Sequence, residues 1–588
     1  MRLRLLIVCA GLSVSLFAQS SDPARQYNST IVVTGSRLGA EIRPAEVITR
    51  ETLDALPVAD TASALRILTG VDFRERIPFG GQADLGLYGS GFEEALVLVD
   101  GIPANDPQTG HHSLEMLPPL EAIDHIEVVQ GPSSVIYGPG ALAGVVQIFT
   151  RRPPTVPDVE ADAAAGSHHL ARGAFYAGGH GLAASGSLLN TAGYTPDTEL
   201  HQANGFARYC AGGFDAEVIA EDKRFGEWQG YSDIFPNEWE AVSGVTGQVK
   251  WNGGPWQLSA GFRQKSDRFI LDRVHPEWYE ASHVAGRWNT QAAYRFAAAG
   301  AAAIVGVDAS RETIDSNQLG DHERNYGGLF GEGFWKFGKA EVDAGLRVDA
   351  MGRRKSLSPQ VSVQWPAGGE WKAFASVGRS ERLPSFTELY TKSPAWVGDP
   401  NLAPEKVWGA DLGVKRAAGA ATITISLFYR RGSGLIDMVR TAGTSAPLAA
   451  RNVQTQETSG LSAQAQGSWN GKLGWQLSSV VMNQSAAWPS GIESRYADDL
   501  LRHKEVAGLT YNGGATRWGL FATASQRQDR SASGEMDASL AWFPKALKGV
   551  SLSLEGRNIL NHSTPGFFGF PGPGRWVWAG ISFSPAAR

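Results

Sequence analysis

The sequence predicts an all-β transmembrane barrel preceded by a smaller α+β domain. Three observations support this fold class. Beyond Pro153-Pro154, apolar and polar residues alternate, as Ile423, Ile425 and Leu427 illustrate, and a period of two is typical of strands. Glycine-rich turns separate these segments, and tryptophans flank several of the turns. No segment approaches the length of apolar run that a membrane helix needs, so a chain that crosses a membrane must do so with strands.

Composition narrows the possible partners. The 588 residues include 53 basic and 59 acidic side chains, a net charge of -6, and no dense basic run. This balance argues against a nucleic-acid partner. The 70 glycines and 18 tryptophans suit a β structure that meets a membrane boundary.

Residues 1–19 are expected to be a signal peptide. Arg2 and Arg4 form a basic start, residues 5–17 form an apolar core too short to span a bilayer, and Ala18 is a plausible cleavage position, with Ser20 as a second candidate. Removal of this segment would leave Cys210 as the only cysteine, which excludes an intramolecular disulfide.

Residues 20–36 form a polar linker that contains a β-prone pentad. The pentad consists of Thr30, Ile31, Val32, Val33 and Thr34. Such a segment can add a strand to the sheet edge of a partner, because main-chain hydrogen bonds supply most of that contact. Alternatively, it forms only the first strand of the domain that follows.

Residues 37–153 form the predicted α+β domain. A short amphipathic helix is expected at residues 62–68, with Asp60 or Thr61 as its cap. The motifs LVLVDGIP, NDPQTGHH and IEVVQGPSSVIYGPGALAGVVQIFT follow between residues 95 and 150. Short β segments interrupted by glycine and proline indicate a small, tightly turned sheet.

Two other interpretations of these motifs are weak. The third glycine of Gly138, Gly140 and Gly144 falls one residue late for a dinucleotide loop. His111 and His112 are adjacent and lack spaced Cys, Asp or Glu partners, so the sequence predicts no metal site and no cofactor.

In their fixed order, the three motifs resemble the plug domain of TonB-dependent outer-membrane receptors. The resemblance implies that residues 37–153 are a plug inside the lumen of the barrel. It also implies that the pentad at residues 30–34 is a TonB box, which contacts the periplasmic energy-coupling protein TonB.

The chain departs from the family pattern at two plug positions. Tyr88 and Gln130 stand where the family commonly has arginines that pair with barrel carboxylates. A buried carboxylate without its partner would be costly. We therefore expect either that the wall lacks those carboxylates or that Tyr88 and Gln130 satisfy them by hydrogen bonds.

The barrel is expected to span residues 154–588. Its turns are predicted near Gly179, Gly212, Gly253, Gly300, Gly338, Gly368, Gly419, Gly471, Gly513 and Lys545. If these ten turns and both barrel ends lie on the periplasmic side, the barrel has eleven hairpins and hence 22 antiparallel strands, a number that agrees with the resemblance to plugged transporters. A water-soluble sandwich gives the same alternation, so the period alone leaves the apolar face unassigned.

Two later segments extend the resemblance. Residues 382–390, RLPSFTELY, and the following GDPNLAPE are similar to a mid-barrel signature of the family. The end of the chain resembles the family's last hairpin, although five residues follow the aromatic Phe583, where the family usually ends.

The candidate solute-binding residues lie on plug loops and barrel loops. Aromatic and charged side chains in a concave site suit a bulky, partly apolar solute. On the plug they are Phe79, Gly80, Gly81, Gln82, Asn105, Asp106, Gln108, Thr109, His111 and His112. On the barrel they are Trp228, Tyr231, Arg273, Trp278 and Tyr279.

The resemblance implies energy-coupled uptake of a scarce nutrient by a monomer in the lipid of the outer membrane of a diderm bacterium. NDPQTGHH and the compact size are similar to the cobalamin-receptor-like subgroup, while iron-chelate receptors share the plug motifs, so cobalamin and a ferric chelate both remain candidates. The alternative is an adhesion or sensing receptor with a permanent plug. No G-x-S-x-G, H-E-x-x-H or P-loop pattern is present, so neither an enzyme nor catalytic residues are expected.

Overall fold

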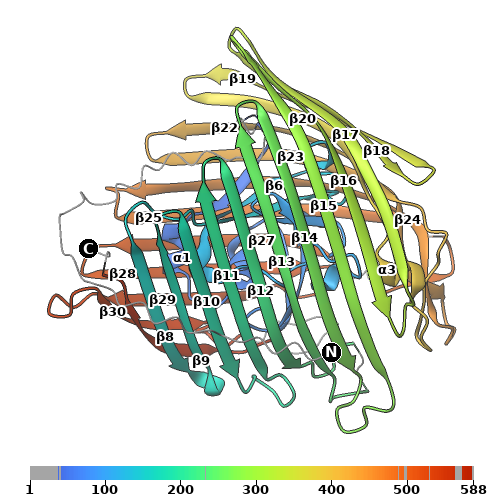
Figure 1. The fold of residues 1–588 in the computed structure, drawn as a ribbon, viewed down its shortest axis with the longest axis horizontal. Helices are drawn as coiled ribbons and strands as arrows, with labels where there is room; N and C mark the ends of the chain where they lie inside the picture. The colour runs from blue at the N-terminus through green and yellow to red at the C-terminus, as the bar shows by residue number, and fades with distance from the viewer. Residues whose placement is uncertain are drawn as a thin grey trace.

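The structure, a computed structural model, describes Leu38 and residues 42–231, 234–487, 489–495, 500–528, 530–562 and 572–585. The predicted signal peptide and the pentad at residues 30–34 lie outside the described residues. Among the described residues, none of the helices has both the length and the apolar character needed to span a membrane. A closed barrel surrounds an N-terminal domain, which we call the plug (Figure 1).

The plug contains a five-stranded sheet in the order β1-β6-β7-β4-β5 and a separate β2-β3 hairpin. Its elements are β1 (Ala45–Ile48), α1 (Arg50–Ala55), η1 (Ala62–Ile67), β2 (Val71–Ile77), β3 (Gln82–Leu87), β4 (Ala95–Val99), β5 (Ile102–Pro103), η2 (Gly110–His112), η3 (Leu120–Ala122), β6 (Ile123–Gln130), α2 (Ser134–Tyr137) and β7 (Gly144–Thr150). All five residues of β4 are buried, which accounts for its unbroken apolar run. The predicted helix at residues 62–68 is the 3-10 helix η1, and the Oδ1 atom of Asp60 accepts a hydrogen bond from the backbone N–H of Ser63 at 2.9 Å.

The barrel sheet is closed by the pairing of β31 with β8. Its elements are β8 (Asp158–Gly166), η4 (Ser167–His169), β9 (Ala171–Gly179), β10 (Leu182–Thr191), β11 (Leu200–Ala211), β12 (Phe214–Gly226), β13 (Trp239–Gly253), β14 (Trp256–Ile270), β15 (Glu280–Ala298), β16 (Ala301–Ser316), β17 (His322–Phe337), β18 (Ala340–Met351), β19 (Arg354–Gly368), β20 (Trp371–Arg382), α3 (Phe386–Tyr390), β21 (Trp396–Val397), β22 (Glu405–Ala418), β23 (Ala421–Thr441), β24 (Leu448–Trp469), β25 (Leu473–Ala487), β26 (Ile492–Ser494), β27 (Leu501–Asn512), β28 (Thr516–Arg527), β29 (Ser533–Trp542), β30 (Val550–Arg557) and β31 (Trp576–Phe583). The short strands β21 and β26 only supplement the wall, so the described residues form 22 antiparallel wall strands.

This count confirms the prediction from the turns. Each of the ten predicted turns lies in a connection between neighbouring wall strands or at the last residue of the strand before it, as Gly253 does at the end of β13. Gly254 has a φ of 58°, a left-handed conformation that glycine adopts at little cost. The predicted boundary at residues 153/154 falls between β7 and β8, and the last strand ends at Phe583.

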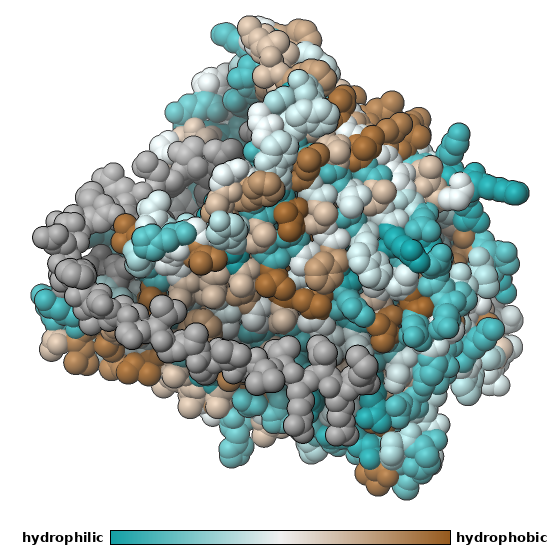
Figure 2. Space-filling model, viewed as in Figure 1, coloured by the Kyte–Doolittle hydropathy of each residue, from teal (hydrophilic) through white to brown (hydrophobic). Residues whose placement is uncertain are grey.

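The structure also assigns the apolar face of the wall. On β14, Leu258 and Phe262 are exposed on the outside, whereas Arg263, Lys265 and Asp267 are buried toward the plug. Large apolar side chains are exposed along many of the wall strands, and Figure 2 shows apolar, pale and hydrophilic areas interspersed on the face toward the viewer. A water-soluble sandwich would bury its apolar face, so this arrangement instead fits a barrel embedded in lipid.

A carboxylate of the wall binds the plug at Gln130. Asp411 on β22 accepts hydrogen bonds from the Gln130 amide at 3.0 Å and from the Arg430 guanidinium at 2.8 Å. The wall thus keeps the carboxylate of Asp411. Its positive partner is Arg430 on β23 of the wall, whereas the family commonly has an arginine on the plug in this role. Gln130 thus satisfies the wall carboxylate by a hydrogen bond, as expected.

Tyr88 contacts a carboxylate within its own domain. Its hydroxyl donates to Glu46 Oε1 at 3.2 Å, and Glu46 also accepts the backbone N–H groups of Thr69 and Gly70, each at 2.8 Å. Its ring packs edge-on against Phe428 of the wall. The acidic group beside Tyr88 is therefore fully hydrogen-bonded.

Candidate functional site between the plug and the wall

The plug loop that contains NDPQTGHH is held in a fixed conformation. The Asn105 side chain accepts the Val97 N–H at 2.7 Å and donates to the Ala95 carbonyl at 2.8 Å. Asp106 accepts the Gln108 N–H at 2.8 Å, and the Thr109 hydroxyl caps η2. The loop therefore presents its side chains to the wall from a rigid base.

A wall helix also binds this loop. The helix α3 begins at a capping box formed by Ser385 and Glu388, which belong to the RLPSFTELY motif. Its first backbone N–H groups, those of Phe386 and Thr387, donate to the carbonyls of Pro107 and Gln108 at 2.9 and 3.0 Å. The mid-barrel signature thus positions the plug loop.

His111 and His112 face different surroundings. His111 Nδ1 lies 2.7 Å from Asp84 Oδ1, and its ring stacks on Phe92. Burial lowers the pKa of His111 and outweighs the opposing effect of Asp84. The ring also lies edge-on to Tyr231 of a barrel loop, whose hydroxyl accepts a hydrogen bond from the Gln82 amide at 2.7 Å. Three predicted solute residues, Gln82, His111 and Tyr231, therefore meet above the plug.

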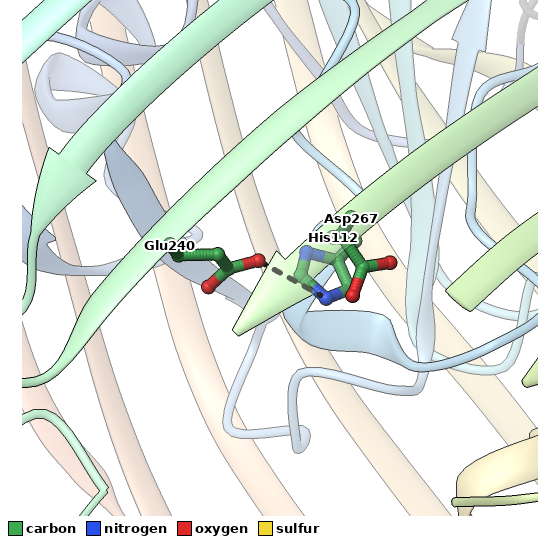
Figure 3. A group of neighbouring side chains, drawn as sticks. All are labelled: His112, Glu240 and Asp267. Atoms are coloured by element: carbon green, nitrogen blue, oxygen red, sulfur yellow. Dashed lines mark ion pairs between the residues drawn. The ribbon is translucent and has the colours of Figure 1, made fainter. Parts of the chain in front are cut away.

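His112 lies in a second group, together with two carboxylates of the wall. Its Nδ1 atom lies 2.9 Å from Glu115 Oε1, and its Nε2 atom lies 3.8 Å from Glu240 Oε1. One ligand atom each from His112, Glu240 on β13 and Asp267 on β14 lie within 4.8 Å of one another (Figure 3). Burial disfavours the protonated imidazole, but the carboxylates of Glu115 and Glu240 outweigh it and raise the pKa of His112.

Buried cations surround this group. Lys265 lies 3.0 Å from Asp267 and 3.6 Å from Asp106, and Arg263 lies 3.1 Å from Asp106. Lys223 lies 3.3 Å from Glu115, and its ammonium group also donates to the carbonyls of Gly80 and Gly81. Two predicted plug glycines thus use their carbonyls to bind the wall.

Phe79 lies beside a cavity of about 140 Å³ between β2 and strands β27 to β30. Its ring packs edge-on against Trp576 and Trp578, with centroids 4.7 and 5.9 Å apart, and Phe79 is buried. The cavity is lined by charged side chains that include Asp72 and Arg527, which form an ion pair. In this conformation Phe79 is part of the packing between plug and wall.

The remaining barrel candidates have separate roles. Arg273 pairs with Asp197 and Glu199, and Trp228 donates its backbone N–H to the Asp197 carbonyl. Tyr279 lies edge-on to Phe269. Trp278 is 55% exposed and stacks on His275, so it is the candidate most available to a solute from outside.

Sequence reasoning missed Glu240, Lys265 and Asp267. A signal was present, because Arg263, Lys265 and Asp267 alternate along one strand face that should be apolar if it met lipid. Their meeting with His112 depends on how the plug sits in the lumen, which the strand pattern does not specify.

The chain is similar to proteins of known families. The family model "TonB dependent receptor-like, beta-barrel" matches residues 172–559, and the model "TonB-dependent Receptor Plug Domain" matches residues 41–145. An "Iron-regulated outer membrane virulence protein" of Vibrio cholerae is 37% identical over 158 residues, which cover 25% of this chain and 24% of that protein.

Solved structures share the fold at low sequence identity. The siderophore receptor PirA from Acinetobacter baumannii has a TM-score of 0.72 and 15% identity, and the alignment covers 92% of this chain and 98% of that chain. The FrpB iron transporter from Neisseria meningitidis (F3-3 variant) has a TM-score of 0.76 and 14% identity, with 92% and 99% covered. The copper transporter OprC has a TM-score of 0.74 and 18% identity, with 92% and 98% covered.

Proposed function

Because the chain belongs to the TonB-dependent receptor family, we propose that it takes up a ferric chelate across the outer membrane with energy delivered through TonB. The observation that supports transport by active work is the plug. It occupies the bore and is bound to the wall by buried charged contacts, such as those of Asp411 with Gln130 and of Asp106 with Arg263. A solute can pass only if this domain moves, and movement that breaks buried ion pairs needs energy from outside the barrel.

The names of similar proteins favour iron over cobalamin. The Vibrio cholerae relative is described as iron-regulated, and two of the similar structures are a siderophore receptor and an iron transporter. The group formed by Gln82, His111 and Tyr231 offers aromatic and polar contacts to a chelate that enters from outside. The Tyr231 ring also contacts Phe269, which contacts Tyr279 beside the exposed Trp278. Cobalamin remains the competing solute and is one arm of the experiment.

The proposed energy input is the pentad at residues 30–34. Strand addition to TonB uses the main chain of this segment, so its N–H groups matter more than its side chains. Replacement of Ile31 by proline removes one donor, whereas replacement by alanine keeps it. We expect Ile31→Pro to abolish uptake and Ile31→Ala to retain most of it.

The experiment measures accumulation of ⁵⁵Fe-labelled siderophores and of ⁵⁷Co-cobalamin in a strain that depends on this receptor. Surface binding of the chelate should persist in Ile31→Pro, because the candidate solute-binding residues are unchanged in this variant. Absence of receptor-dependent accumulation of every solute in the wild type would support an adhesion or sensing role with a permanent plug. Uptake of iron that is unaffected by Ile31→Pro would show that the pentad does not deliver the energy. Accumulation of cobalamin alone would replace the ferric chelate as the solute.

A further inference from the structure

We infer that His112, Glu240 and Asp267 form a binding site for one divalent first-row transition-metal ion, which joins the plug to the wall. This goes beyond the proposed uptake, because purified protein would bind the ion whether or not it transports a solute. The site would take the free ion through protein side chains rather than through a chelator. The three residues come from η2, β13 and β14, and all are buried.

The ligand set suits such an ion. Imidazole nitrogen combined with carboxylate oxygen is typical of zinc, iron and manganese sites, whereas calcium and magnesium prefer oxygen alone. His112 Nε2 and Glu240 Oε1 are 3.8 Å apart, and the three ligand atoms lie within 4.8 Å of one another. With metal–ligand bonds of about 2.0–2.2 Å, adjacent ligand atoms need to lie roughly 3–4 Å apart, so only small side-chain rotations are required.

The orientation of His112 fits metal binding. Its Nδ1 atom faces Glu115 at 2.9 Å, which leaves Nε2 directed toward Glu240. Metal-binding histidines commonly place the other ring nitrogen against a carboxylate, which fixes the tautomer and makes the binding nitrogen more basic. Glu115 would have this supporting role.

A fourth ligand is available on β15. His283 Nε2 lies 3.9 Å from Asp267 Oδ2, and its Nδ1 lies 2.7 Å from the Ser316 hydroxyl. Lys265 contacts the other oxygen of Asp267, Oδ1, at 3.0 Å. Asp267 can therefore keep its ion pair with Lys265 through Oδ1 while Oδ2 turns to the ion.

The charges of the buried side chains around His112 favour binding of a cation. In the described part of the chain, buried charged side chains around His112 are linked by nitrogen–oxygen distances of 4.0 Å or less. The set comprises the carboxylates of Asp106, Glu115, Glu221, Glu240 and Asp267 and the cations Lys223, Arg263 and Lys265. Counted as ionised, the five carboxylates face three cations and the imidazoles of His112 and His283. The set is therefore acidic, and a bound divalent cation would offset negative charge that is costly to bury.

The test uses the full-length protein in detergent, stripped of metal with a chelator. Equilibrium dialysis against Zn²⁺ and Co²⁺, followed by elemental analysis, should give one ion per chain, and bound Co²⁺ should show the visible absorption of a site with nitrogen and oxygen ligands. Mutation of a residue that only supports a metal ligand typically weakens metal binding about 10-fold to 100-fold. His112→Ala removes a direct ligand and should weaken Zn²⁺ binding by at least that much. Asp267→Asn, which preserves shape, should weaken it similarly.

The matched control is His111→Ala, which removes the adjacent histidine. His111 contacts Asp84 and Phe92 rather than the proposed ligands, so this variant should keep one ion per chain. Absence of bound Zn²⁺ and Co²⁺ in the wild type would overturn the proposal and indicate that protons balance the excess charge. Unchanged binding in both His112→Ala and Asp267→Asn, or equal competition by Ca²⁺, would also overturn it.

Discussion

At the scale of single residues, burial and neighbouring charge give adjacent histidines different properties. His111 and His112 follow each other in the chain, yet the pKa of His111 is lowered by burial, and that of His112 is raised because its carboxylate neighbours outweigh burial. One ring stacks on Phe92 beside a single carboxylate, while the other lies between Glu115 and Glu240. Adjacent residues of one type can therefore have separate roles.

His125 on β6 provides a test of this electrostatic argument. Its Nδ1 lies 2.7 Å from Asp124 and its Nε2 lies 3.2 Å from Glu127. Burial lowers its pKa, but these two hydrogen bonds outweigh burial and raise the pKa to about 9. NMR of ¹³C-labelled histidine rings should show a group that titrates near this value and disappears in His125→Gln.

The sign of the stability effect follows from that shift. An unfolded histidine has a pKa of about 6.5, so the protonated His125 stabilises the plug fully below this pH, and the stabilisation is lost as pH rises through about 9. The His125→Gln variant should lack this pH dependence. Titration of His125 near 6.5 would contradict the assignment.

At the scale of elements, charged side chains of wall strands fasten the plug. Asp411 on β22 binds Arg430 on β23 and Gln130 on β6. On β27, Lys504 donates to the carbonyls of Leu68 and Val71, both at 2.7 Å. One contact is made with Gln130 at the end of β6 and the other with the segment between η1 and β2, so each can be tested separately.

The first element-scale prediction concerns Arg430. Arg430→Met leaves Asp411 buried without a cation and should destabilise the docked plug by about 3–5 kcal/mol, measured by calorimetry in detergent. The double variant Gln130→Arg, Arg430→Met moves the positive charge from the wall to the plug and should recover much of the loss. Equal stability of Arg430→Met and wild type would show that Gln130 and Ser376, which also binds Asp411, suffice.

The second concerns Lys504. Lys504→Met removes the ammonium donor from the carbonyls of Leu68 and Val71, and the loss costs roughly 1–3 kcal/mol for each group left unsatisfied. Hydrogen exchange should become faster at residues 66–71 and remain unchanged in α3 on the far part of the wall. Faster exchange across the whole plug would instead mean that Lys504 supports the entire domain.

At the scale of the molecule, the plug occupies the bore of the closed barrel. Many large apolar side chains are exposed along the wall strands, so the barrel should insert into lipid without the plug. We expect deletion of residues 42–150 to give a folded barrel that conducts ions across planar bilayers, while the intact protein remains closed. A silent barrel after deletion would show that the loops above the plug also seal the pore.

The sequence by itself determined the number of wall strands and the place of the turns, and it predicted a division at Pro153-Pro154, a position that lies between β7 and β8. These depend on local properties, namely the period of two and the chemistry of glycine-rich turns. The sequence did not distinguish the 3-10 helix η1 from an α-helix, because short helices are decided by their packing.

Only the tertiary structure decided which face of the wall meets lipid and which side chains meet His112. Glu240 and Asp267 are 128 and 155 residues away from His112 along the chain, and Arg430 replaces a plug arginine from a strand far from Gln130. Such contacts are set by closure of the barrel around the plug. A local pattern specifies that a strand has a polar face, but the partner of each polar side chain depends on where the enclosed domain comes to rest.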